Sequence, residues 1–202
     1  MWAYTACVPL VAPDRIESSR VLVRLLEEAD LPSLLQMNSN AEVTALLPYA
    51  TWTCLADGNA WYERMRGIEA TGTALQFVVV SKSANVAIGT CLLFRLEEAS
   101  ARAELGYALG REYWRLGLMR EALFELLRAA FGSMGLRRIE AEVNTRNAAS
   151  AQLLGRLGFT KEGLLRKRWV VKGQEEDVEI FGLLRGELRA VPTYRAGQGR
   201  DI

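Results

Sequence analysis

The chain has 202 residues, half of them hydrophobic and about a quarter charged, which is the composition of a globular protein with room for one α/β domain. Its formal net charge of +1 gives no electrostatic basis for binding nucleic acid. The absence of histidine excludes Ser-His-Asp and Cys-His catalysis and HExxH zinc chemistry, so any proton transfer must use carboxylates, Tyr, Lys, Cys, Ser or water.

The cysteines and the N-terminal residues indicate the cellular compartment of the protein. Cys7, Cys54 and Cys91 are odd in number and scattered, so neither a disulfide framework nor a CxxC motif can be drawn, and a reducing cytoplasm fits best. The first residues lack a basic stretch, and no apolar run reaches the roughly 18 residues of a membrane span. We therefore expect a soluble, cytoplasmic protein without a membrane partner or a metal.

The first half of the chain predicts two helices and four strands. A short strand over 20–25 precedes a helix that begins near Ala29, with Asp30 as its cap. A second helix is predicted over 57–70. Three strand candidates follow, separated by polar turns, and form an antiparallel meander: 75–81, 86–94 and 101–109.

The second half alternates helices and strands. A helix after Gly117 carries apolar residues at helical spacing, with Glu121 among those facing water. The strand 138–143 follows this crossover helix and should run parallel to the strand before it. Asn147 can cap a further helix that Gly158 ends, and two late strands are predicted over 159–171 and 177–184. We divide the chain into an N-terminal extension (1–17), one domain (18–187) and a C-terminal tail (188–202).

The stretch 103–122 is the most informative part, because a strand passes through a glycine turn directly into an amphipathic helix. The unpaired N–H groups and the dipole of a helix N-terminus attract anions, and Gly117 has no Cβ to keep a phosphate from them. Arg111, Arg115 and Arg120 surround the turn. An ordinary turn with solvated arginines is the alternative. The fingerprints of nucleoside-triphosphate and dinucleotide sites are absent.

Several segments together resemble the GNAT superfamily of N-acetyltransferases, within it the RimJ/RimL-like branch: SSRVLVRLLEEAD, AIGTCLLF, AELGYALGREYW, GLMREAL and EVNTRNAASAQLLGRLGFTKEG. The resemblance implies an α/β fold of the α+β kind, in which helices flank a mixed, mostly antiparallel twisted sheet that splays open between the fourth and fifth strands. Acetyl-CoA would lie in the opening, with its pantetheine arm paired to main-chain groups from Leu105 to Leu109.

The resemblance also implies which residues bind the cofactor. The turn of the family, [QR]-x-x-G-x-[GA], here begins at Trp114, and its pyrophosphate-binding residues would be Arg115, Leu116, Gly117, Leu118, Met119 and Arg120. Met119 replaces a small residue, and periodicity places its side chain on the buried stripe of the helix. Asn147 and Ser150 match an N-x-x-S motif that touches the pantetheine arm and the sulfur, although both also suit helix capping. Asn144 is assigned to the same site.

Acetyl transfer to an amine, which the resemblance implies, needs a base that accepts the proton of the amine and a group that assists the leaving thiolate. Strand alternation places Glu104 beside the opening as the candidate base, either directly or through water; the alternative is a solvated carboxylate paired with Arg102. By resemblance, Ser150 would assist the leaving thiolate, with Tyr107 as a substitute. Some relatives carry a glutamate on the strand after LGF..EG, where this chain has Trp169.

The resemblance therefore implies acetyl transfer from acetyl-CoA to a primary amine. N-terminal peptide amines, aminoglycoside-like polyamines and small metabolites all remain open as acceptors, and a non-catalytic acyl-CoA-binding or regulatory module is the alternative function. Relatives of this branch often form homodimers. Tryptophans 52, 61 and 114 would line an acceptor pocket or fill the core. An acidic set would attract a cationic acceptor or form a solvated face: Glu97, Glu98, Glu175, Glu176 and Asp177.

Overall fold

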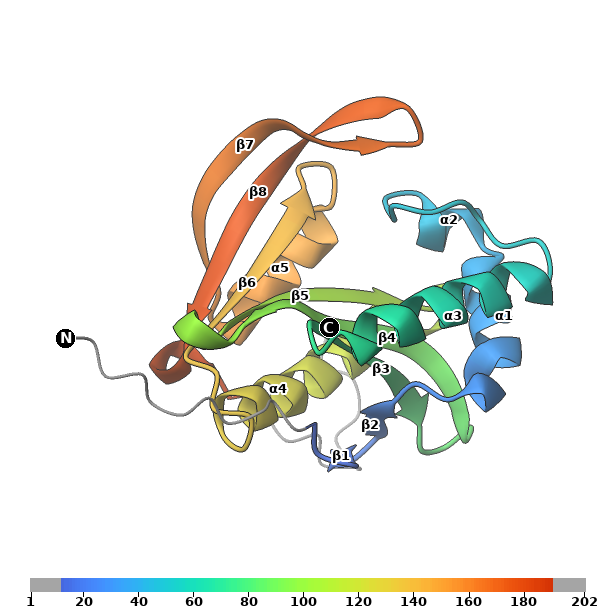
Figure 1. Cartoon of the computed structure of the whole chain (residues 1–202), viewed down its shortest axis with the longest axis horizontal. Coiled ribbons are helices and arrows are strands. Elements are labelled where there is room, and N and C mark those ends of the chain that lie inside the picture. The colour runs from blue at the N-terminus through green and yellow to red at the C-terminus, as the bar shows by residue number, and fades with distance from the viewer. Residues whose placement is uncertain (1–11, 191–202) are drawn as a thin grey trace, which may run out of the picture.

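The computed structural model describes residues 12–190 as an eight-stranded sheet flanked by helices (Figure 1). The strand order is β1-β2-β3-β4-β5-β6-β8-β7, and every neighbouring pair is antiparallel except β5 and β6. The strands are β1 (Ile16–Glu17), β2 (Val21–Leu25), β3 (Ala74–Ser81), β4 (Val86–Glu97), β5 (Arg102–Leu109), β6 (Arg138–Asn144), β7 (Thr160–Val171) and β8 (Gln174–Leu184). The helices are α1 (Leu31–Asn38), α2 (Ala41–Thr44), α3 (Leu55–Ala70), α4 (Leu118–Phe131) and α5 (Ala148–Leu157).

Helices cover both faces of the sheet and so create two hydrophobic cores. The larger core joins α4 and α5 to one face, and the smaller joins α1 and α3 to the other. The central strand β3 contributes to both because its side chains alternate: Phe77 and Val79 enter the larger core, and Val78 and Val80 the smaller. The predicted mixed, mostly antiparallel sheet is thus confirmed.

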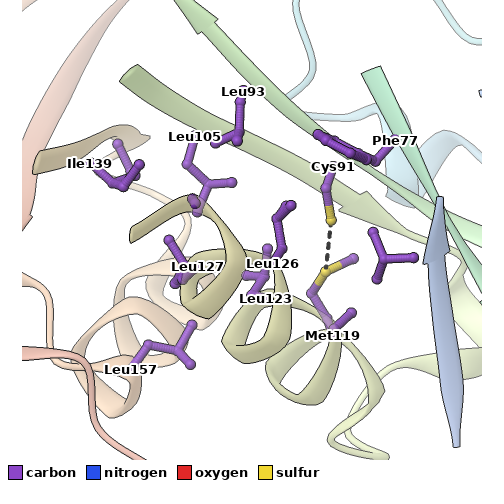
Figure 2. Close-up of a cluster of buried hydrophobic side chains, with 14 of the residues drawn as sticks. Phe77, Cys91, Leu93, Leu105, Met119, Leu123, Leu126, Leu127, Ile139 and Leu157 are labelled. Atoms are coloured by element: carbon purple, nitrogen blue, oxygen red, sulfur yellow. Dashed lines mark hydrogen bonds between the residues drawn. The ribbon is translucent and has the colours of Figure 1, made fainter. Parts of the chain in front are cut away.

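The amphipathic stripe of α4 is buried as its spacing predicts. All seven apolar positions of the stripe are buried: Met119, Ala122, Leu123, Leu126, Leu127, Ala130 and Phe131. Figure 2 shows this stripe beneath the sheet, with the Cys91 thiol donating to the Met119 sulfur at 3.9 Å. The first turn of α4 is therefore anchored in the core.

The strands β5 and β6 diverge after a short parallel pairing. β5 and β6 pair only at Arg102–Arg138, Ala103–Ile139 and Glu104–Glu140. Beyond these pairs, β5 continues along β4 and β6 continues along β8. Because β1 was not predicted, β5 and β6 are the fourth and fifth strands of the sequence analysis. The predicted opening between them therefore exists, and it begins at Glu104.

Several local features differ from the sequence expectations. α3 begins two residues earlier than predicted, and α2 and the two-residue β1 were not expected. Asp30 does not cap α1 through its side chain; its carboxylate instead binds Arg24 and accepts from the N–H of Glu27. Most of the predicted extension (1–17) and tail (188–202) lies outside the described residues. Across the described part of the chain, every helix is too short or too polar to serve as a membrane span.

Candidate active site

The Gly117 turn (residues 115–120) presents a row of unused backbone donors. Arg115 and Gly117 both adopt left-handed conformations, with φ of 63° and 76°. Such a turn gathers successive N–H groups into an anion-binding concavity at the start of α4. Within the described residues, none of the N–H groups of the Gly117 turn donates a hydrogen bond. The turn thus retains the donors that a diphosphate requires.

A buried carboxylate, Glu121, links the start of α4 to the residues before β2. Glu121 does not face water as predicted; it accepts hydrogen bonds from the Ser19 hydroxyl (2.9 Å), the Arg20 N–H (2.8 Å) and Arg20 Nε (2.7 Å). Burial alone would raise the pKa of Glu121, but hydrogen bonds from Ser18, Ser19 and Arg20 outweigh it and lower the pKa. This carboxylate is therefore a structural anion.

The arginines around the turn have different roles. Arg111 lies away from the turn, paired with Glu42 of α2 and stacked on the Trp114 ring, because the helical turn before Trp114 directs it toward α2. Arg115 is exposed, and Arg120 Nε is buried with no partner within the described residues. A buried guanidinium donor without an acceptor costs free energy unless a ligand satisfies it.

The hydrophobic residues of the turn point in two directions. Leu118 and Met119 are buried in the core beneath α4, so the larger Met119 side chain points away from the turn. Leu116 is exposed, and its carbonyl accepts from Arg20 Nη1 at 2.9 Å. Met119 therefore leaves the main-chain donors accessible.

A cavity of about 420 Å³ lies where β5 and β6 diverge, and all three predicted catalytic residues line it. Its walls come from β3, β4, β5, β6, β7, α3, the start of α5 and the segment after α2. The predicted site residues on its walls are Glu104, Leu105, Tyr107, Asn144, Asn147 and Ser150. Leu109 is not among them; its carbonyl accepts from Trp114 Nε1 at 2.7 Å. The remaining wall is largely apolar or aromatic, as with Leu47, Trp61 and Phe94.

Glu104 is buried at the apex of the opening, with 7% of its surface exposed. Its partner is not Arg102, which binds Glu97 and Glu140, but Arg95 at 2.6 Å. Arg95 reaches it because the β4–β5 ladder is irregular after Phe94 and Arg95 takes a left-handed φ of 49°. Burial raises the pKa of Glu104, and Arg95 offsets this only in part.

Tyr107 and Ser150 form a hydroxyl pair across the opening. The Tyr107 hydroxyl lies 2.7 Å from Ser150 Oγ, and either can be the donor. Burial raises the pKa of Tyr107, which keeps its proton at neutral pH. Asn147 caps α5, since its side-chain oxygen accepts from the Ser150 N–H at 3.1 Å. Asn147 thus caps α5 and, like Ser150, also lines the cavity.

Asn144 presents a buried amide to the same cavity. Its Oδ1 accepts from the Arg146 N–H at 2.9 Å, which fixes the orientation of the amide group. Its Nδ2 is buried and has no partner within the described residues. Such a donor is suited to a carbonyl oxygen of a bound ligand.

Sequence reasoning missed Glu142, a second carboxylate on the cavity wall. It accepts hydrogen bonds from Trp169 Nε1 (2.7 Å) and Arg168 Nη2 (3.2 Å), and Arg95 Nη1 lies 3.5 Å away. Trp169 of β7 therefore reaches past β8 and orients a carboxylate of β6. Alternation along β6 places Glu142 on the same face as Glu140, which is the one signal the sequence offers.

The acidic set predicted from charge does not line the cavity. Glu97 and Glu175 pair with Arg102 and Lys167, Glu176 pairs with Arg146, and Asp177 accepts from the Lys167 N–H. These residues belong to the sheet surface and the β7–β8 hairpin.

The three tryptophans also separate. Trp61 lines the cavity, Trp52 is buried beside it with ring centroids 5.6 Å apart, and Trp114 braces the end of β5. Only Trp61 is therefore placed to meet an acceptor directly.

The residues present fit acetyl-CoA. The unused N–H groups and Arg120 at the Gly117 turn suit phosphate oxygens, and Asn144 Nδ2 suits an amide or thioester carbonyl. The edge of β5 that faces away from β4 is unpaired with β6 beyond Glu104, so it can pair with an extended ligand. Donors for the two ends of such a ligand thus lie on the Gly117 turn, which does not line the cavity itself, and on the cavity wall.

Comparison with known proteins agrees with this geometry. Residues 20–160 match the family model described as an acetyltransferase (GNAT) domain. An uncharacterized N-acetyltransferase, p20 of Bacillus licheniformis, is 34% identical over 86% of this chain and 98% of its own. The [ribosomal protein uS5]-alanine N-acetyltransferase of Escherichia coli K12 is 30% identical over 91% of this chain and 95% of its own. A probable GNAT acetyltransferase structure from Chromobacterium violaceum superposes with a TM-score of 0.81, at 27% identity, over 93% of this chain and 94% of that one. The chain therefore belongs to the GNAT family and is an acetyl-CoA-dependent N-acetyltransferase.

Proposed function

We propose that this enzyme acetylates the N-terminal α-amine of a protein or peptide. The observation that carries the proposal is the arrangement in the cavity, where one carboxylate of raised pKa, Glu104, faces an opening shared with the Tyr107–Ser150 pair. Acetyl-CoA supplies the acetyl group as an activated thioester. The Gly117 turn, Asn144 and Asn147 hold it, with Leu105 to Leu109 along its pantetheine arm.

The residues of the chain then manage two protons. As the amine nitrogen bonds to the acetyl carbon, Glu104 takes the proton that the nitrogen loses, directly or through one water. As the carbon–sulfur bond breaks, the Tyr107–Ser150 hydroxyl pair supports the departing sulfur by hydrogen bonding or proton donation. Arg95 favours the ionised form of Glu104, which is the form that accepts a proton.

The pKa of the acceptor amine favours an α-amine over a lysine. Deprotonating a lysine amine of pKa 10.4 at pH 7 costs about 4.6 kcal/mol, whereas an α-amine near 7.7 to 8.0 costs about 1 to 1.4 kcal/mol. The Escherichia coli relative is named for an alanine of a ribosomal protein, and alanine offers no amine besides its α-amine. A polycationic acceptor is less suited, because arginines already hold both carboxylates of the cavity, Glu104 and Glu142.

Acceptor screening tests this proposal. Release of the CoA thiol is measured with peptides that have a free N-terminus and no lysine, with N-terminally blocked peptides that contain lysine, and with spermidine. We expect turnover with the free N-termini. Faster turnover with the blocked peptides or with spermidine would contradict an α-amine acceptor.

A further inference from the structure

Arg20 lies against the Gly117 turn although it is 96 residues away from Leu116 in sequence. It immediately precedes β2, and its guanidinium is bound on two sides. Nε donates to Glu121 at 2.7 Å, and Nη1 donates to the Leu116 carbonyl at 2.9 Å. The Arg20 backbone N–H donates to the same carboxylate at 2.8 Å, so the residue has one fixed orientation.

This contact fixes the orientation of a peptide plane. The described residues contain no cis peptide bond, so the Leu116–Gly117 bond is trans and its C=O and N–H point to opposite sides. A carbonyl that faces Arg20 therefore directs the Gly117 N–H away from Arg20. The plane needs such a restraint because Gly117 is permissive and its neighbour Arg115 is also left-handed.

We propose that Arg20 is a positioning residue for cofactor binding: by holding the Leu116 carbonyl, it keeps the Gly117 N–H directed at the diphosphate of the cofactor. The inference rests on the cofactor placement proposed above. Glu121 neutralises the guanidinium at close range, so the contribution of Arg20 is directional more than coulombic. Lysine cannot replace it, because a single ammonium lacks the planar fork that reaches both acceptors.

Calorimetric binding of two ligands separates positioning from other roles. CoA carries the diphosphate and pantetheine does not. In Arg20→Lys we expect CoA to bind about tenfold more weakly, the loss of roughly one hydrogen bond, and pantetheine to change by less than about twofold. The matched control is Arg24→Lys. Arg24 lies within β2 and makes a similar two-nitrogen contact with the buried Asp30, so its substitution should leave both affinities unchanged.

The amide resonance of Gly117 gives a second readout. In the wild-type protein, CoA should shift this resonance downfield, and pantetheine should not. Arg20→Lys should reduce the shift. If Arg20→Lys binds CoA with wild-type affinity, or binds CoA and pantetheine equally more weakly, the proposed role of Arg20 is wrong but the placement of the diphosphate is not affected. If wild-type protein binds CoA no better than pantetheine, the diphosphate placement itself fails, and the role of Arg20 fails with it.

Discussion

The Gly117 turn and the acceptor cavity each contain a buried glutamate, and the two glutamates have opposite properties. Glu121 and Glu104 are almost equally buried, at 8% and 7% exposure. Glu121 accepts from Ser19 and twice from Arg20, and its pKa is lowered, whereas Glu104 has Arg95 as its hydrogen-bond donor and its pKa is raised. The extra donors around Glu121, set against the stronger desolvation of Glu104 and the like charges of Glu142 and Glu140 near it, thus separate a structural carboxylate from one suited to accept a proton.

The sharpest test of this contrast is Glu104→Gln. We expect kcat to fall by about 10²- to 10⁴-fold, because a general base is lost, while CoA affinity stays unchanged. Steady-state kinetics and calorimetry measure the two quantities. Glu142→Gln is the control on the same cavity wall, and it should affect the acceptor KM more than kcat. An unchanged kcat in Glu104→Gln would remove Glu104 from the mechanism.

Substitution of Gly117 tests the other region. Gly117→Leu forces a side chain into a left-handed conformation and should weaken CoA binding by about tenfold or more. Gly72→Leu is the matched control, since Gly72 has a similar φ of 72° and open space around it but lies just after α3, outside the Gly117 turn. Both variants should lose similar stability. If Gly117→Leu binds CoA as wild type does, the diphosphate is placed wrongly.

The two glutamates should also affect stability with opposite signs. A lowered pKa means that Glu121 stabilises the fold above its unfolded pKa near 4.5 and loses this effect as pH falls through the folded value. Glu121→Gln should therefore cost about 1–2 kcal/mol of unfolding free energy at pH 7 and little in acid.

The raised pKa of Glu104 reverses that dependence, since its ionised form is disfavoured in the folded state and lowers stability above the folded pKa. Glu104→Gln should consequently be neutral or stabilising at pH 7. Urea unfolding at several pH values compares the two variants. A large loss of stability in Glu104→Gln would show that this carboxylate is structural as well.

The smallest predicted effect is a shift of a pH profile. Arg95 favours the ionised form of Glu104, while Glu140 and Glu142 on β6 oppose it. Arg95→Gln should move the acidic limb of kcat/KM to higher pH, by less than about one unit because Arg95 is largely solvent-exposed. An unmoved or lowered limb would show that another group titrates there.

Periodicity predicted the elements that bury one face. The stripe of α4, the meander and the parallel crossover to β6 follow from spacing that local sequence carries. The opening was implied by the resemblance to the GNAT superfamily, and strand alternation then placed Glu104 beside it. β1 could not be predicted from the sequence, because a strand of two residues shows no alternation. α2 has four residues, which are too few to show a helical period.

Side-chain partners could not be predicted in the same way. Glu121 has the spacing of an exposed residue, and its burial depends on Ser19 and Arg20, about a hundred residues away. The donors of Glu142 come from irregular strand segments, Arg95 after the β4 irregularity and Arg168 within that of β7. Irregular ladders redirect side chains against simple alternation, which is why this carboxylate and its partners were missed.

The anchoring of Met119 beneath the first turn of α4 has a thermodynamic consequence. Because this turn cannot fray without opening the main core, a ligand held there opposes unfolding of the whole molecule instead of one helix end. By linkage, CoA at a hundred times its dissociation constant should add about 2.7 kcal/mol to global stability. Melting temperature thus becomes a direct gauge of cofactor occupancy.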